Sequence, residues 1–79
     1  MHIKILGPGC RNCAALERET RAVIAELGVD ATIEKVANFA DIAAYGIMST
    51  PGLVVDEEVL VSGRVPRAEE IATLLASRR

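Results

Sequence analysis

The sequence predicts an α/β domain with the element order β-α-β-α-β-β-α, in which a four-stranded mixed sheet is sandwiched by three helices. Short runs of apolar and branched residues alternate with segments of helical periodicity. The first two runs are separated by one long helical segment, as a right-handed crossover between parallel strands requires. The last two runs are joined by a short turn, which predicts a hairpin. A chain of 79 residues has room for one core, so we expect a single domain over residues 1–79.

The first half of the chain reads as a βαβ unit. Residues 2–6 alternate between polar and apolar, then become fully apolar and end at Gly7-Pro8-Gly9, which predicts a buried strand. Apolar positions at helical spacing then predict a helix from residue 10 or 11 to Leu27, with Gly28 as its C-terminal stop. Residues 29–36 alternate between apolar and polar and predict a second strand.

A short second helix is predicted next. Asn38, with Asp41 three residues later, resembles a helix N-cap and its reciprocal partner. Phe39, Ile42 and neighbouring apolar residues mark the helix, which we expect to end near Gly46.

The last third of the chain predicts a hairpin and a covering helix. Residues 53–55 and 59–61 are rich in Val and Leu, and the acidic residues 56–58 connect them. The last helix is expected to start near Arg67, with Glu69 and Glu70 in its first turn and Arg78 and Arg79 in its last, where their charges suit the helix dipole.

Composition excludes several classes of function. The chain is 51% hydrophobic and 25% charged with a net charge of −2, which is typical of a globular domain. Basic and acidic residues are interleaved and aromatic residues are scarce, so the chain lacks the basic face and stacking platforms of nucleic-acid binders. No segment has the length of a membrane span or the pattern of a signal peptide. We therefore expect a cytoplasmic monomer with no nucleic-acid or membrane partner.

The segment Cys10-Arg11-Asn12-Cys13 holds the two cysteines of the chain and lies where the first strand gives way to the long helix. A thiol at a helix start faces unpaired N–H groups and the positive end of the dipole, which favour its thiolate. A second thiol one turn later can close a disulfide ring. Because stable disulfides are uncommon in the cytosol and a short ring removes little chain entropy, the pair predicts thiol–disulfide exchange more than structural stapling.

With a Thr-Pro ahead of the predicted hairpin, this motif resembles the thioredoxin superfamily, in particular its glutaredoxin-sized small redox-active disulfide proteins. The resemblance covers essentially the whole chain, and its specific parts are residues 9–13 and 49–55. It implies that Cys10 is the attacking thiol and Cys13 the resolving thiol. It also implies a cis Thr50–Pro51 bond, with the backbone of Thr50 pairing with an extended substrate segment. We add Arg11, a cation beside the attacking thiol, to the predicted substrate-binding residues.

Three positions depart from the pattern of true thioredoxins. Gly9 stands where they carry Trp, Arg11-Asn12 where they carry Gly-Pro, and Lys4 where they bury an acid. Lys4 could lie near Cys13 and favour its thiolate. The alternative, which we favour, is a stem lying on the sheet with its charged head in solvent.

The sequence therefore predicts a thiol–disulfide oxidoreductase that acts on protein disulfides without an organic cofactor, and that receives electrons from a separate reductase or a small thiol.

A different hypothesis is a soft-metal carrier of the Cu or Zn type that uses the same cysteines. Heavy-metal-associated domains run β-α-β-β-α-β, so a helix after Val36 favours exchange and a strand there favours metal transfer. A third hypothesis is a binding module without catalysis.

Overall fold

The computed structural model describes residues 1–9, 11–47 and 49–77. Its elements, in chain order, are β1 (His2–Leu6), α1 (Arg11–Leu27), β2 (Thr32–Val36), α2 (Phe39–Ala44), β3 (Gly52–Val55), β4 (Glu58–Ser62) and α3 (Ala68–Ala76). The predicted order β-α-β-α-β-β-α is confirmed. The helix after Val36, which separates this order from that of heavy-metal-associated domains, is α2.

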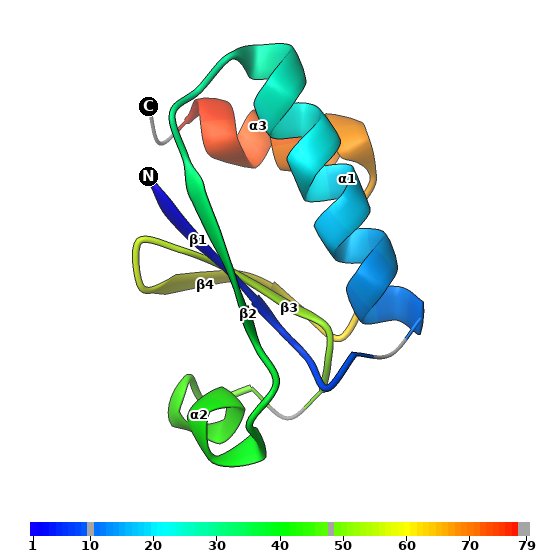
Figure 1. The fold of residues 1–79 in the computed structure, drawn as a ribbon, viewed down its shortest axis with the longest axis vertical. Coiled ribbons are helices and arrows are strands. Elements are labelled where there is room, and N and C mark those ends of the chain that lie inside the picture. The colour runs from blue at the N-terminus through cyan, green and yellow to red at the C-terminus, as the bar shows by residue number, and fades with distance from the viewer. Residues whose placement is uncertain (10, 48, 78–79) are drawn as a thin grey trace.

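The four strands form one mixed sheet in the order β2-β1-β3-β4. β1 is parallel to β2 and antiparallel to β3, and β3 and β4 form the antiparallel hairpin. α1 makes the crossover between the two parallel strands, and in Figure 1 it lies beside α3, apart from α2. The start of α1 and the loop before β3 both lie at the end of the sheet where β1 finishes.

Alternation along β1 divides the core between the two faces of the sheet. Ile3 and Ile5 pack with residues of α1 and α3, whereas Leu6 packs with Ile42 of α2 on the other face. The larger, first core also contains Leu16, Val23, Leu53, Val55, Val61, Ile71 and Leu75. The smaller one also contains Val36 and Val54. The three helices therefore sandwich the sheet, as the sequence predicted.

The bounds of the second strand differ from the prediction. The second strand starts at Thr32 and not at residue 29, because its partner begins at His2, which lies opposite Thr32. Phe39, the first residue of α2, is 71% exposed. The helix is short and turns Ile42 toward the sheet, which leaves Phe39 facing solvent. Arg78 and Arg79 lie outside the described residues.

Asn38 is the predicted N-cap of α2, and its side chain accepts hydrogen bonds from the backbone N–H groups of Ala40 and Asp41.

Within the described ranges, no helix is long and apolar enough to cross a lipid bilayer.

Candidate active site

Cys13 is the third residue of α1 and is buried, with 5% of its surface exposed. It is in the disulfide-bonded form. Cys10, the predicted attacking thiol, lies outside the described residues. Arg11 is the exposed first residue of α1, at the same end of the helix as Cys13. The structure therefore describes the predicted resolving cysteine and the start of its helix.

Gly7 stands between Cys13 and the loop before β3. A Cβ atom placed on Gly7 would overlap Sγ of Cys13, would lie 3.0 Å from the Cβ of Cys13, and would lie 3.9 Å from the Cβ of Thr50. The N–H of Gly7 donates a 2.8 Å hydrogen bond to the carbonyl of Val36 and fixes this residue against β2. A residue with no side chain is therefore required for Cys13 to pack beside the end of β1.

From its sequence context, Gly7 is recognisable only as the end of a strand, and this packing role is not. The available signal was a glycine directly after a buried strand and six residues before a cysteine. That signal is weak, because a turn glycine gives the same pattern.

The Thr50–Pro51 peptide bond is cis, which is the geometry that the resemblance implies. Pro51 is fully buried and its carbonyl accepts a 2.9 Å hydrogen bond from the N–H of Gly63. The next residue, Gly52, pairs with Leu6 at the end of β1. This pairing brings Thr50 to the end of the sheet that also carries Cys13. The structure thus brings together Cys13, Thr50 and Pro51 from the predicted site.

Lys4 lies in a different place from the one that we favoured. Its side chain is 17% exposed, its Nζ is 2.7 Å from Oε1 of Glu57, and it donates a 2.5 Å hydrogen bond to Oη of Tyr45. The hydrogen bond to Glu57, and then that to Tyr45, raise the pKa of Lys4 above its ordinary range. The prediction of a solvated head is wrong, because a carboxylate and a phenol oxygen take the place of water.

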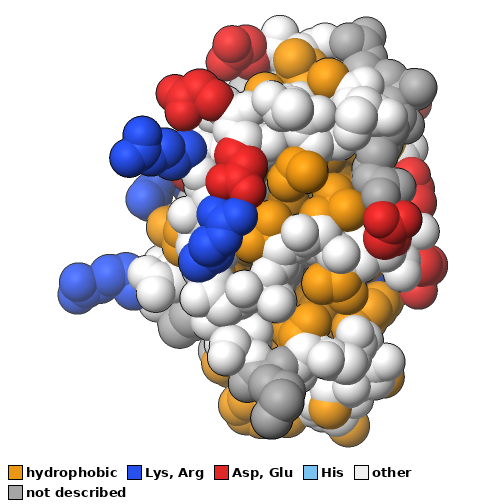
Figure 2. Space-filling view, turned by 180° about the vertical axis from the view of Figure 1, so that it is seen from behind, with side chains coloured by type: hydrophobic (Ala, Val, Ile, Leu, Met, Phe, Trp, Pro, Cys, Tyr) orange, Lys and Arg blue, Asp and Glu red, His pale blue; other side chains and the backbone are white. Residues whose placement is uncertain are grey.

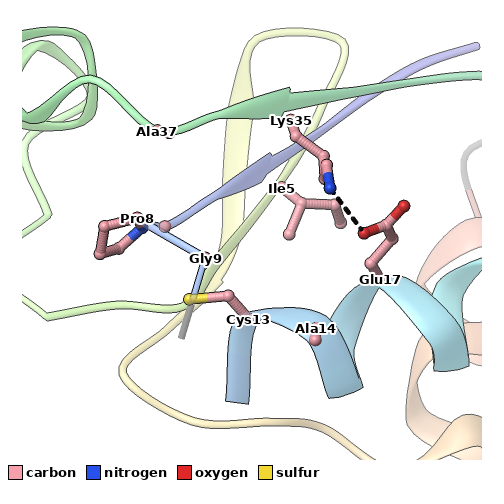
Figure 3. Close-up of a pocket in the computed structure, with 9 residues that line it drawn as sticks. Ile5, Pro8, Gly9, Cys13, Ala14, Glu17, Lys35 and Ala37 are labelled. Carbon is pink, nitrogen blue, oxygen red and sulfur yellow. Dashed lines mark ion pairs between the residues drawn. The ribbon is translucent and has the colours of Figure 1, made fainter. Parts of the chain in front are cut away.

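A cavity of about 200 Å³ adjoins Cys13. Figure 3 shows it between the start of α1 and the strands β1 and β2, with Cys13 at one end and an ion pair between Glu17 and Lys35 at the other. Oε1 of Glu17 is 3.5 Å from Nζ of Lys35, and Oε2 is 3.0 Å from Nε of Arg21. The hydrogen bond from Arg21, with a smaller contribution from Lys35, holds the pKa of Glu17 below its usual range.

A second, apolar hollow of about 310 Å³ adjoins Thr50. Its lining residues come from α2 and the segment that follows, and are Phe39, Ile42, Ala43, Ile47, Ser49 and Thr50. We name this hollow the α2 groove. The lower end of Figure 2, where Figure 1 places α2, shows hydrophobic side chains and no charged ones on that face.

Nearly the whole chain matches known proteins. A family model described as a thioredoxin domain matches residues 1–76. The chain belongs to the thioredoxin family. It is 43% identical over 76 residues to a protein named thioredoxin from Methanothermobacter thermautotrophicus, a match that covers 96% of this chain and 99% of that relative. It is 36% identical over 75 residues to a protein named thioredoxin from Methanocaldococcus jannaschii, covering 95% of this chain and 86% of the relative.

Membership in the thioredoxin family confirms the resemblance drawn from the sequence. The soft-metal alternative expected a strand after Val36, whereas this thioredoxin-family domain has α2 there. In residues 1–9, 11–47 and 49–77, no group of three or more His, Cys, Asp and Glu side chains is placed to hold a metal ion.

Proposed function

We propose that this domain is a thiol–disulfide oxidoreductase that acts on protein disulfides through Cys10 and Cys13. The observation that carries the proposal is the position of Cys13, which is buried in the first turn of α1, in the disulfide-bonded form, and next to the cis Thr50–Pro51 bond across Gly7. The two relatives named thioredoxin support the same chemistry.

The reaction proceeds in two exchanges. The thiolate of Cys10 attacks one sulfur of a substrate disulfide, forms a mixed disulfide and releases the first substrate thiolate. Cys13 then attacks the sulfur of Cys10, so that the ring disulfide forms and the second substrate thiolate leaves. Two electrons pass from the cysteine pair to the substrate. A separate reductase or a small thiol reverses both steps, and no organic cofactor is needed. The reducing cytoplasm is the compartment that suits such a cycle.

Burial gives the two thiols different tasks. A buried thiol is a poor target for external disulfides, since it is shielded and its thiolate is disfavoured. Once the mixed disulfide exists, however, a neighbouring thiol has a much higher effective concentration than any external one. The burial of Cys13 therefore suits the resolving step.

The substrate-binding part of the proposal rests on Thr50 and its surroundings. We propose that the backbone of Thr50 pairs with an extended substrate segment, and that the α2 groove receives an apolar side chain of that segment. Arg11, exposed at the start of α1, adds a positive charge that favours the thiolate and an approaching anionic group.

A trapping experiment tests the proposal. The Cys13→Ser variant cannot resolve the mixed disulfide, so it should accumulate a covalent complex with a disulfide-bonded test protein, visible by intact mass and lost on reduction. The matched Cys10→Ser variant should trap far less, because its remaining thiol is buried. Equal trapping by the two variants, or none by either, would show that the roles or the chemistry are wrong.

A further inference from the structure

The burial of Cys13 hinders the loss of its thiol proton. To resolve a mixed disulfide, its thiol must lose a proton, because the thiolate is the nucleophile. Removal from water disfavours the thiolate, and a side chain that is 5% exposed gives bulk base little direct access. The proton must therefore leave through the protein or through a cavity that reaches the sulfur.

The cavity beside Cys13 offers such a route. Its volume of about 200 Å³ has room for several water molecules, since each needs roughly 30 Å³ in the liquid. Apart from Cys13, the lining residues that the structure describes are glycine, proline, alanine and isoleucine, with two exceptions, Glu17 and Lys35. Among these residues, the carboxylate of Glu17 is the group able to accept a proton near neutral pH.

Glu17 is placed for this task by the geometry of α1. It follows Cys13 by four residues, so both side chains lie on the same face of the helix. Figure 3 shows them at the two ends of the cavity, with Ile5 of β1 forming the wall opposite the helix. The side chain of Glu17 is 20% exposed, so a proton that it accepts can pass on to solvent.

The charged groups that face Glu17 are Arg21 from α1 and Lys35 from β2. They hold the pKa of its carboxyl group low, which keeps it an anion at neutral pH and fixes its orientation toward β2. Lys4 is engaged by Glu57 and Tyr45, and its place in the alternation of β1 directs it away from Ile5 and this cavity.

We propose that Glu17 is the proton acceptor for Cys13, which it reaches through water in the cavity, when Cys13 resolves the mixed disulfide. The inference rests on the proposed exchange function. The proton moves from Sγ of Cys13 through water to the Glu17 carboxylate as the Cys13–Cys10 bond forms and the Cys10–substrate bond breaks. The substrate leaves as a thiolate, and Glu17 then releases the proton to solvent. In the reverse direction, Cys13 leaves as a thiolate and receives its proton by the same path.

Stopped-flow reaction of the reduced protein with a chromogenic aryl disulfide separates the two steps. The attack of Cys10 releases one coloured thiolate, and resolution by Cys13 releases a second. For Glu17→Gln we expect an unchanged first phase and a second phase slowed about tenfold or more near neutral pH. The deficit should shrink at alkaline pH, where Cys13 ionises without help. Glu26→Gln, the same change at an exposed position of α1, should leave both phases unchanged.

The sign of the effect distinguishes proton transfer from a purely electrostatic role. Without a nearby carboxylate the Cys13 thiolate is easier to form, so an electrostatic effect alone would make the second phase of Glu17→Gln faster. Glu17→Asp, which keeps the carboxylate, should resolve faster than Glu17→Gln. A second phase in Glu17→Gln that equals or exceeds the wild-type rate, or equal rates in the Asp and Gln variants, would overturn the inference. Loss of both phases in the wild-type protein would instead reject the exchange function itself.

Discussion

Gly7 and Cys13 are packed so closely that residue 7 has no space for a side chain: a Cβ there would overlap Sγ of Cys13. Gly7 directly follows β1, and Cys13 lies in the first turn of α1, so this contact fixes the helix start against the end of the sheet. The same Cβ would lie 3.9 Å from the Cβ of Thr50, which makes Gly7 the point where the helix, the sheet and the cis-proline loop meet. Four predictions follow from this and other contacts.

We expect Gly7→Ala to destabilise the domain by roughly 1–3 kcal/mol, the usual cost of an added methyl group in a packed site. The cost should differ between the disulfide and dithiol forms, because the clash partner is a sulfur whose position the disulfide constrains. Urea unfolding of both forms measures the two values. Gly52→Ala is the matched control, since its Cβ would meet the end of the Ile47 side chain at 2.8 Å and not Cys13. An equal loss of unfolding free energy for Gly7→Ala in both forms would contradict the prediction that the added methyl group clashes with Sγ of Cys13.

The Lys4–Glu57 ion pair predicts a pH-dependent contribution to stability. Lys4 lowers the pKa of Glu57 from its ordinary value of 4.5, so the contribution is complete above that pH and is lost as the pH falls below it. Glu57 and Tyr45 raise the pKa of Lys4 from 10.5, so the contribution is complete below that pH and is lost as the pH rises above it.

Lys4→Met should therefore lower Tm by only a small amount, because Glu57 is largely exposed and solvent weakens the ion pair. The difference in Tm between the variant and the wild type should be greatest between pH 4.5 and pH 10.5. Thermal unfolding followed by circular dichroism across this pH range measures it. Lys35→Met, at a lysine that is 66% exposed, is the control and should show a weaker loss. A Lys4→Met difference that stays constant down to pH values well below 4.5 would argue against the pair.

Phe39 tests the use of the α2 groove for substrate. Because its side chain is 71% exposed, Phe39→Ser should leave Tm nearly unchanged. If the groove receives an apolar substrate side chain, kcat/KM for a protein disulfide should fall about fivefold or more, while the rate with a small aryl disulfide is retained. Ala40→Ser, at an exposed residue of α2 that does not line the groove, is the control. An equal loss with both substrates would place the effect on the cysteines and not on the groove.

Asn38 tests how far α2 depends on its N-cap. Its Oδ1 accepts hydrogen bonds from the N–H groups of Ala40 at 2.8 Å and Asp41 at 3.3 Å. Asn38→Ala should therefore lower the free energy of unfolding by about 1 kcal/mol. Amide hydrogen exchange should rise in α2 and not in α1, because α2 is a short helix that depends on its cap. Asn38→Asp keeps the acceptor and should retain protection. Uniform loss of protection across the chain would show that the cap matters for global stability only.

The sequence by itself determined the order of the elements, because apolar periodicity, glycine stops and the Asn38 cap are local signals. It also placed Cys13 in the first turn of the long helix and, through the family resemblance, indicated the cis bond before Pro51. Only the tertiary structure decided that the second strand begins at Thr32, that Lys4 is bound by Glu57 and Tyr45, that Gly7 makes room for Cys13, and that Glu17 shares a cavity with that cysteine. The reason is that periodicity shows which residues share a face of one element, whereas these contacts depend on the pairing of β1 with β2 and β3 and on the packing of α1 across the sheet.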